Sequence, residues 1–332
     1  MASAKFDTVG IGNAIVDVIA RCEDEFLAQH NMSKGHMKLL EQEEASSLYD
    51  AMGPATETSG GSAANTCAGI ASFGGDAAFI GRVADDQLGR IFSHDIRSIG
   101  VDFNTKPSAD GAPTARSLIL VTPDGERTMN TYLGASVELG EAELDRDKIE
   151  AAHLTYLEGY LFDPPLAQAA FHEAAAIAAQ AGRQVALSLS DAFCVSRHRA
   201  AFRSLIQGGV DLLFANESEI CALYEVDSFD EAARAVREEC RMAALTRSEK
   251  GSVIVTPDEE IEIEAFPVDN IVDMTGAGDL YAAGFLYGHA MGRDLPACGK
   301  LASLAASETI GHIGARPEVP LDRLAREHGL IG

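Results

Sequence analysis

The chain has 332 residues, 46% of them hydrophobic, and its 26 basic and 51 acidic residues give a net charge of −25. This charge disfavours binding to nucleic acid or anionic membranes, because both would repel the protein. No stretch reaches the ~18 consecutive apolar residues of a transmembrane helix, and residues 1–6 lack the apolar region of a signal peptide, so we expect a cytoplasmic protein. No linker rich in proline, glycine or serine divides residues 1–332, so we expect one large domain.

The cysteines are scattered singly, without a Cys-x-x-Cys pair. This spacing argues against a zinc site and against a disulfide framework. We therefore expect reduced thiols, most of them in the core, at Cys22, Cys67, Cys194, Cys221, Cys240 and Cys298.

The first predicted strand, residues 6–11, leads into the sequence Gly10-Ile11-Gly12-Asn13-Ala14-Ile15-Val16-Asp17. A dinucleotide-binding loop would have a third glycine at position 15 and would open a helix, whereas an extended run follows here, so we reject that fold. Asn13 and Asp17 are either turn residues or ligand contacts. The two acceptor oxygens of one carboxylate suit a vicinal diol.

A second glycine-containing sequence, Gly60-Gly61-Ser62-Ala63-Ala64-Asn65, opens a predicted helix of small residues that ends at Gly74-Gly75. In the purely structural interpretation, Ser62 caps this helix and Asn65 faces solvent. Around it we expect a helix over 41–52 and strands over 77–83, 115–121 and 127–133, the last two joined by a turn over 122–126.

From residue 153 onward, predicted strands and helices alternate. This alternation indicates βαβ units and a mostly parallel sheet with helices on both faces. The predicted elements are 153–158, 164–182, 184–189, 196–207, 211–214, 216–223, 242–246, a hairpin over 253–255 and 261–265, and a last helix over 296–311.

The strand over 211–214 runs into Asn216-Glu217-Ser218-Glu219. At the start of a helix, Asn216 and Glu219 face the same side because they lie three residues apart. This spacing fits a capping box, with Asn216 as the N-cap and Glu219 at the third helical position. It also fits a polar pair that could hold a hydrated metal ion.

The most informative stretch is Asp273-Met274-Thr275-Gly276-Ala277-Gly278-Asp279, which opens a helix of small and apolar residues reaching Met291. Its two glycines allow a ligand to approach the main chain, and the positive end of the helix favours an anion. A plain helix cap would also have an acidic residue in the first turn. Because five fixed positions would recur by chance about once in a thousand such chains, we favour a functional role.

The Asp273–Asp279 sequence resembles the C-terminal signature of the ribokinase-like (PfkB) family of carbohydrate and nucleoside kinases, with Met274 where a small hydroxyl residue is usual. Gly60–Asn65 resembles the N-terminal signature, and Gly81–Gly89 resembles a structural turn of the family, with Ala84 in place of a glycine. The resemblance implies an α/β, three-layer fold with a central, mostly parallel sheet. It also implies a small β-sheet lid, built from about 13–60 and 112–135, that excludes water from the site.

The resemblance further implies roles for individual residues. Asp279 would be the catalytic base, and the N–H groups of Gly276, Ala277 and Gly278 would form an anion hole. Besides the wall of the base site, the residues implied to contact the substrate are Asn13, Asp17, Gly60, Gly61, Asn65 and Asp279. Those implied to contact ATP are Asn216, Glu219, Thr246, Arg247, Gly251, Thr275, Gly276 and Gly278, where the loop 246–251 has Ser248 in place of a usual glycine.

The resemblance also implies cofactors. Asn216 and Glu219 would hold Mg²⁺ through water, Asp273 and Thr275 are candidates for a bound K⁺, and Arg127 is a lid residue that is either solvated or turned toward the transferred phosphate.

Three segments, Phe26–Leu39, Tyr156–Leu161 and Leu187–Phe193, are similar to the members of the family that phosphorylate adenosine. In those proteins the corresponding apolar and aromatic residues sandwich the purine, although each such residue here also fits a plain core position. The predicted wall of the base site is Leu39, Leu133, Tyr160, Leu161 and Phe193.

The implied activity is transfer of the ATP γ-phosphate to the 5′-hydroxyl of adenosine, giving AMP and ADP in purine salvage. The alternatives are a related kinase acting on inosine, guanosine, a sugar or a sugar acid, and a non-catalytic nucleoside-binding regulator. The presence of Asp279 with both glycines argues against the regulator. The sequence leaves open whether the protein is a monomer or a homodimer, because the lid edge can be solvated or shared.

Overall fold

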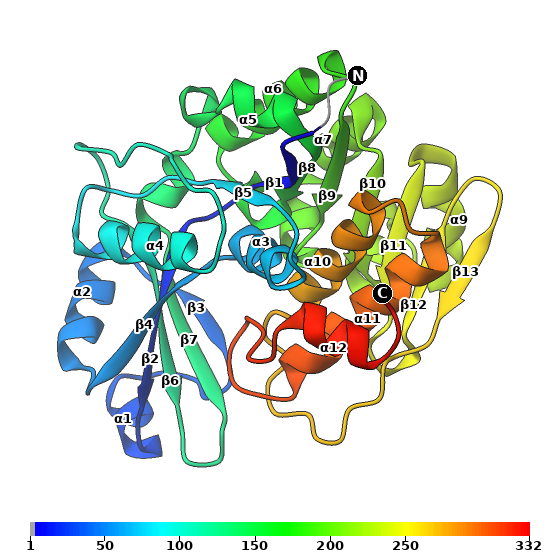
Figure 1. Cartoon of the computed structure of the whole chain (residues 1–332). Helices are drawn as coiled ribbons and strands as arrows, with labels where there is room; N and C mark the ends of the chain where they lie inside the picture. The colour runs from blue at the N-terminus through cyan, green and yellow to red at the C-terminus, as the bar shows by residue number, and fades with distance from the viewer. Residues whose placement is uncertain (1–3) are drawn as a thin grey trace.

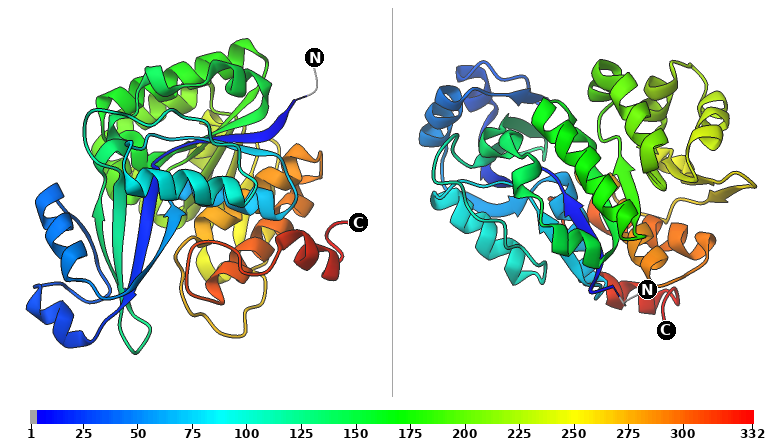
Figure 2. Two further views of the ribbon diagram at one scale, coloured as in Figure 1. Left: turned by 60° about the vertical axis from the view of Figure 1, so that its left-hand side comes forward. Right: turned by 90° about the horizontal axis from the view of Figure 1, so that it is seen from above.

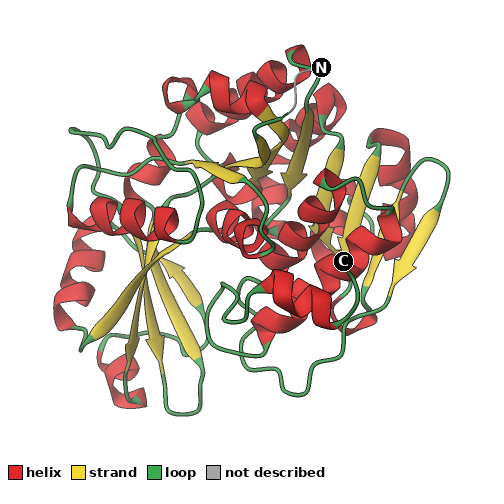
Figure 3. Cartoon of the chain, viewed as in Figure 1, coloured by secondary structure: helices red, strands yellow, loops and turns green. Residues whose placement is uncertain are grey.

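The computed structural model describes residues 4–332 and contains two β-sheets (Figures 1 and 3). The larger sheet has the strand order β13-β12-β11-β10-β9-β8-β1-β5. Its strands from β5 to β11 are parallel to their neighbours, whereas β12 and β13 pair antiparallel. The strand bounds are β1 (Phe6–Ile11), β5 (Ala77–Ile80), β8 (Ala152–Glu158), β9 (Gln184–Ser188), β10 (Leu212–Asn216), β11 (Met242–Thr246), β12 (Ser252–Val255) and β13 (Glu260–Ile263).

Helices cover both faces of this sheet (Figure 2), and successive side chains of its buried strands point to opposite sides. In β8, Tyr156 packs in the core under α3, α10 and α11, whereas Leu157 packs in the core under α6 to α9. The predicted three-layer fold with a mostly parallel sheet is therefore confirmed. The helix bounds are α3 (Ser62–Ser72), α4 (Gln87–Ser98), α5 (Arg146–Ala151), α6 (Pro165–Gln180), α7 (Ala192–Gly209), α8 (Glu217–Tyr224), α9 (Phe229–Glu239), α10 (Ala277–Ala290), α11 (Leu295–Ile310) and α12 (Leu321–Glu327).

The smaller sheet has the strand order β3-β7-β6-β2-β4 and lies beside the larger one (Figure 1). Its strands are β2 (Ile15–Arg21), β3 (Met37–Leu39), β4 (Ala55–Gly60), β6 (Ala115–Val121) and β7 (Arg127–Tyr132), with α1 (Asp24–Gln29) and α2 (Gln42–Ala51) between them in the chain. Alternate residues of β2 are buried, so one face of the sheet is covered. The described chain passes between the sheets four times, from β1 to β2, from β4 through α3 to β5, from β5 through α4 to β6, and from β7 to β8.

Several element bounds differ from those predicted by the sequence. The helix predicted over 196–207 begins at Ala192, because the Asp191 side chain accepts a hydrogen bond from the Cys194 N–H (2.7 Å) and caps it earlier. Its backbone is kinked at His198. Short 3₁₀ turns, which the sequence did not predict, lie at η1 (Gly134–Glu138), η2 (Glu141–Glu143), η3 (Gly159–Phe162) and η4 (Ser248–Lys250).

The six cysteines are free thiols, as predicted.

Within residues 4–332, no helix has the length and apolar character needed to cross a membrane.

Candidate active site

Asp279 lies in the first turn of α10, where side chains of α3 hold it. Ser62 Oγ donates a hydrogen bond to one carboxylate oxygen (2.6 Å), and Asn65 Nδ2 donates to the other (3.1 Å). Thr66 Oγ1 donates to the Asp279 main-chain oxygen (3.1 Å), so the starts of α3 and α10 are joined. Ser62 therefore does not cap α3, whose N-cap residue is Gly61, and Asn65 does not face solvent.

The environment of Asp279 raises the pKa of its carboxyl group to about 6. Burial is the main cause, and the nearby charge of Asp17 adds to it, whereas the hydrogen bonds from Ser62 and Asn65 act in the opposite direction. At pH 7 the carboxylate form still predominates, and it is more basic than an ordinary aspartate. Such a group can accept a proton from a hydroxyl.

The loop before α10 exposes main-chain N–H groups. Gly276 has φ +80°, and a Cβ at this position would lie 2.7 Å from the Ala315 Cα, so only glycine fits. Within residues 4–332, the N–H groups of Gly276, Gly278 and Asp279 have no hydrogen-bond partner, and the space around Gly278 is open. The N–H of Ala277 is different, because it donates to the Met274 carbonyl (3.2 Å). The geometry thus offers three free donors, with Asp279 in place of the predicted Ala277.

Asp17 projects from β2 toward Gly60, the last residue of β4, and Gly61 follows as the N-cap of α3. A Cβ on Gly60 would lie 2.5 Å from an Asp17 carboxylate oxygen, and a Cβ on Gly61 would lie 2.1 Å from the Asn13 carbonyl oxygen. The glycines are therefore required for the close approach of these segments. In the described chain, the Asp17 carboxylate has no hydrogen-bond donor. Burial raises its pKa to about 6, while the charges of Arg316 and Arg127 act to lower it.

Glu158, at the end of β8, is a buried carboxylate that the sequence analysis did not select. One oxygen accepts from Asn13 Nδ2 (2.7 Å), the other accepts from the Ala63 N–H (2.8 Å), and the side chain is 1% exposed. Burial raises its pKa to about 7, and the charge of Asp279 adds to the rise. Glu158 thus fixes Asn13 and the start of α3, while Asn13 Oδ1 remains buried without a partner in the described chain. A glutamate at the end of the predicted strand 153–158 is the signal that the sequence offers.

A salt bridge connects the smaller sheet to the loop before α10. Arg127 of β7 pairs with Asp273, and both side chains are almost fully buried. Asp273 also accepts hydrogen bonds from Thr275 Oγ1 (2.7 Å) and the Gly314 N–H (3.1 Å). Burial acts to raise the pKa of Asp273, but these hydrogen bonds and the Arg127 charge outweigh it and lower the pKa. Protein donors thus contact both carboxylate oxygens of Asp273, and a K⁺ site at Asp273 and Thr275 stays a prediction.

Comparison with known proteins agrees with this arrangement. The model of the pfkB family of carbohydrate kinases matches residues 29–322. The chain belongs to this family. A crystal structure of adenosine kinase from Sinorhizobium meliloti is 54% identical, with a TM-score of 0.90 over 98% of this chain and 100% of that one. A probable sugar kinase from Rhizobium etli CFN 42 is 51% identical, with a TM-score of 0.91 over 99% and 100%.

A more distant relative is named for another activity. The ATP-dependent ribose-1-phosphate kinase of Halopiger xanaduensis is 30% identical over 271 residues, which cover 81% of this chain and 86% of that protein. Membership in the PfkB family makes the protein a kinase for a small molecule of the nucleoside or sugar class, and it implies ATP and a divalent cation.

The predicted metal pair of this PfkB kinase forms the capping box of α8. Asn216 Oδ1 accepts from the Glu219 N–H (2.9 Å), and Asn216 Nδ2 donates to a Glu219 carboxylate oxygen (2.6 Å). Burial raises the Glu219 pKa to about 7, with a further contribution from Asp191. Residues 4–332 contain no cluster of three or more potential metal-ligating His, Cys, Asp or Glu side chains. The pair therefore fits a hydrated cation bound through water, and direct coordination would break the cap.

The predicted nucleotide loop is a tight turn between β11 and β12. Gly251 has φ +80°, and a Cβ there would lie 2.0 Å from the Ile263 carbonyl oxygen. Ser248 also has a positive φ of +52°, which explains why glycine is the usual residue at that position. Thr246 ends β11. The Arg247 guanidinium lies over the Phe229 ring, 4.2 Å from its centroid, and Arg247 Nε lies 3.9 Å from a Glu217 carboxylate oxygen. The Arg247 side chain is therefore packed against the protein, not extended into solvent.

The predicted wall residues divide into two groups. Leu39 is 56% exposed, Tyr160 47% and Phe193 77%, so these are not core residues. Leu161 is fully buried in the core beneath α6 to α9 and cannot line a site with them. Leu133 is partly buried just after β7.

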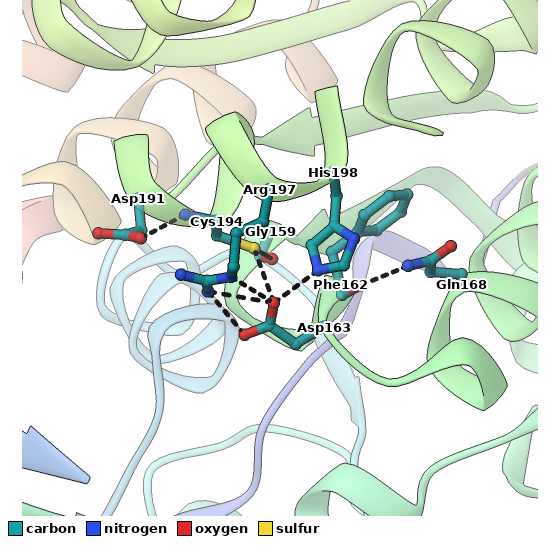
Figure 4. Close-up of polar contacts among 8 residues, drawn as sticks. All are labelled: Gly159, Phe162, Asp163, Gln168, Asp191, Cys194, Arg197 and His198. Carbon is teal, nitrogen blue, oxygen red and sulfur yellow. Dashed lines mark hydrogen bonds and ion pairs between the residues drawn. The ribbon is translucent and has the colours of Figure 1, made fainter. Parts of the chain in front are cut away.

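Polar contacts fix the segments that carry Tyr160 and Phe193 (Figure 4). Asp163, just after η3, accepts hydrogen bonds from Arg197 (2.9 Å) and pairs with His198 Nε2 (2.7 Å) on α7. Cys194 Sγ contacts the Gly159 carbonyl oxygen (3.5 Å). The two exposed aromatic side chains are therefore presented by segments that are tied together.

Proposed function

We propose that the protein transfers the γ-phosphoryl group of ATP to the 5′-hydroxyl of adenosine, giving AMP and ADP in purine salvage. The observation that carries the proposal is the position of Asp279. It lies at the helix end that bears the free N–H groups of Gly276 and Gly278, and close enough to Asp17 for the charge of Asp17 to raise its pKa.

In this proposal, Asp279 accepts the proton of the 5′-hydroxyl as the hydroxyl oxygen attacks phosphorus. The N–H groups of Gly276, Gly278 and Asp279 donate to the oxygens of the phosphoryl group as it moves. Because the transition state of phosphoryl transfer is loose, positioning and charge stabilisation contribute more than proton removal. A divalent cation held through water near Asn216 and Glu219 would neutralise charge on the phosphates.

Two features support adenosine as the acceptor. The free carboxylate oxygens of Asp17 and the unpartnered Asn13 Oδ1 can accept hydrogen bonds from ribose hydroxyls. Leu39, Tyr160 and Phe193 are exposed apolar side chains that a flat base could cover. The 54% identity to an adenosine kinase also favours a nucleoside over a free sugar.

The test is ADP production by the purified protein with ATP, Mg²⁺ and a panel containing adenosine, inosine, guanosine, ribose, fructose, ribose 1-phosphate and gluconate. We expect adenosine to have the highest kcat/KM. A higher value for a sugar or sugar acid would contradict the assigned acceptor. Nucleoside binding without turnover of any acceptor would favour a regulator.

A further inference from the structure

Arg316, in the segment between α11 and α12, is the feature that the proposed mechanism does not use. Its guanidinium Nε donates to Asn65 Oδ1 (3.2 Å), and Nη1 donates to an Asp95 carboxylate oxygen (3.1 Å). The side chain is 19% exposed, and Nη2 is buried without a partner among residues 4–332. A buried guanidinium with one nitrogen that lacks a hydrogen bond lowers the stability of the folded state, unless interactions with its neighbours compensate.

The contact with Asn65 determines which way the Asn65 carboxamide points. Because Oδ1 accepts from Arg316, Nδ2 is directed to the Asp279 carboxylate, to which it donates at 3.1 Å. A reversed carboxamide would place two donors against each other at Arg316 and two acceptors against each other at Asp279. Arg316 therefore orders the hydrogen bond that holds the proposed base.

The contact with Asp95 connects the same chain of hydrogen bonds to the smaller sheet. Asp95, on α4, also accepts a hydrogen bond from the main-chain N–H of Ser59 in β4 (2.8 Å). Ser59 immediately precedes Gly60 and Gly61, the two residues that lie against Asp17 and Asn13. One guanidinium thus connects the end of β4 to the carboxylate of α10.

Arg316 is also one of two charged groups that act on Asp17. The other is Arg127 on β7, which is already paired with Asp273. Burial raises the pKa of Asp17, whereas the charges of Arg316 and Arg127 favour its ionised form and act to lower the pKa. An ionised Asp17 is needed if both of its oxygens are to accept from hydroxyl groups.

We propose that Arg316 is a positioning residue of the acceptor site, which orients Asn65 toward Asp279 and supplies positive charge beside Asp17. This inference rests on the proposed roles of Asp17, Asn65 and Asp279 in phosphoryl transfer. It adds a residue from a separate segment that no part of the sequence pattern selected.

Two variants separate the two tasks of Arg316. Arg316→Gln removes the charge and keeps a donor, so the acidic limb of kcat/KM should move upward by about one pH unit. Arg316→Lys keeps the charge but lacks the planar guanidinium, which bonds Asn65 through one nitrogen and Asp95 through another. In that variant we expect the acidic limb to stay in place and kcat to fall about tenfold. Both are measured with the best acceptor of the panel.

Arg82 provides a matched control. It is 20% exposed, forms salt bridges with Glu138 and Glu143, and has an unpartnered buried Nε, but none of its contacts involves the site. Arg82→Gln and Arg82→Lys should change thermal stability without moving the pH profile. Circular dichroism confirms that each variant is folded before the kinetic comparison.

A second measurement does not depend on turnover, so it separates failure of this inference from failure of the proposed function. The pKa of Asp17 is followed by the ¹³C shift of its carboxyl group, assigned with Asp17→Asn, in the wild type, Arg316→Gln and Arg82→Gln. We expect a higher pKa only in Arg316→Gln. An unchanged Asp17 pKa together with wild-type kcat and KM in both Arg316 variants would overturn the inference.

Discussion

Two sets of polar residues, the capping box of α8 and the junction of the two sheets, look alike in the sequence but differ in whether their polar atoms have hydrogen-bond partners. In the capping box of α8, the side-chain oxygens of Asn216 and Glu219 accept hydrogen bonds from main-chain or side-chain donors of the same turn. At the junction of the two sheets, by contrast, Asn13 Oδ1 and Arg316 Nη2 are buried without a partner in the described chain, and the partly buried Asp17 carboxylate has no hydrogen-bond donor there. An unpartnered buried polar group costs about 1–3 kcal/mol, which a satisfied cap avoids. The contrast supports the proposal that the junction binds a ligand, whereas the hydrogen bonds of the capping box stabilise the fold.

The strongest test of this contrast is Asp279→Asn. The amide cannot take the proton of the acceptor hydroxyl, so we expect kcat to fall at least about 100-fold. Adenosine binding, measured by calorimetry, should remain within about threefold, because Asp17 and Asn13 are unchanged. Full activity of this variant would contradict the assigned role of Asp279.

The two glycines of the α10 loop give a second, paired test. Gly276→Ala should lower the free energy of unfolding by about 2 kcal/mol, because the residue has a positive φ and the added Cβ would meet Ala315. Gly278→Ala should leave stability unchanged or raise it by about 0.5–1 kcal/mol, because nothing lies within 4 Å of its Cβ. Its kcat/KM for ATP should nevertheless fall about tenfold, since the methyl group covers a free donor. Equal effects of the two variants on urea unfolding would contradict this distinction.

The buried carboxyl groups predict how stability depends on pH. The folded-state pKa values of Glu158 and Glu219 are raised to about 7, above the ordinary 4.5 of a glutamate. A raised carboxyl pKa means that the folded state binds the proton more tightly than the unfolded state does. The stabilisation that each protonated carboxyl group gives the folded state is therefore complete below pH 4.5 and is lost as the pH rises to about 7. We expect the free energy of unfolding, from urea titrations between pH 5 and 8, to decline over this range and to decline less in Glu158→Gln. A steeper decline in that variant would refute the assignment.

The smallest effect is expected at the capping box. Asn216→Ala should lower the free energy of unfolding by about 1 kcal/mol, because the first turn of α8 loses its cap, whereas Asn216→Ser should retain most of it. If the pair also holds a hydrated cation, both variants should raise the Mg²⁺ concentration needed for half-maximal activity, with little change in KM for adenosine. An unchanged Mg²⁺ requirement in both would leave the pair with its capping function alone.

Local patterns predicted most of the fold. Strands 115–121 and 242–246 have the predicted bounds, because alternating or continuous apolar residues end at clear turn residues. The start of α7 was predicted four residues late because Asp191 caps it, and a cap depends on a single side chain. The pairing order of the smaller sheet could not be predicted, since β2 pairs with β4 and β6 from distant parts of the chain.

Prediction of the site was less complete for the same reason. Asp17, Gly60, Asn65 and Asp279 lie in short glycine-marked sequences and were selected from them. Glu158 and Arg316 stand alone in their segments, and only the tertiary structure brings them to the other residues, at separations of 145 and 251 positions along the chain from Asn13 and Asn65. No spacing rule connects such residues.

The buried salt bridge between Arg127 and Asp273 has a consequence for how binding and motion are linked. The bridge fastens the smaller sheet to the loop that carries the free main-chain amides, and Arg127 Nε remains without a partner in the described chain. If an anion binds this loop, as the proposed function requires, the charge of Arg127 acts on that anion and on Asp273 together. Movement of β7 would then alter how tightly the anion is held, and binding of the anion would alter the position of β7 by the same free energy.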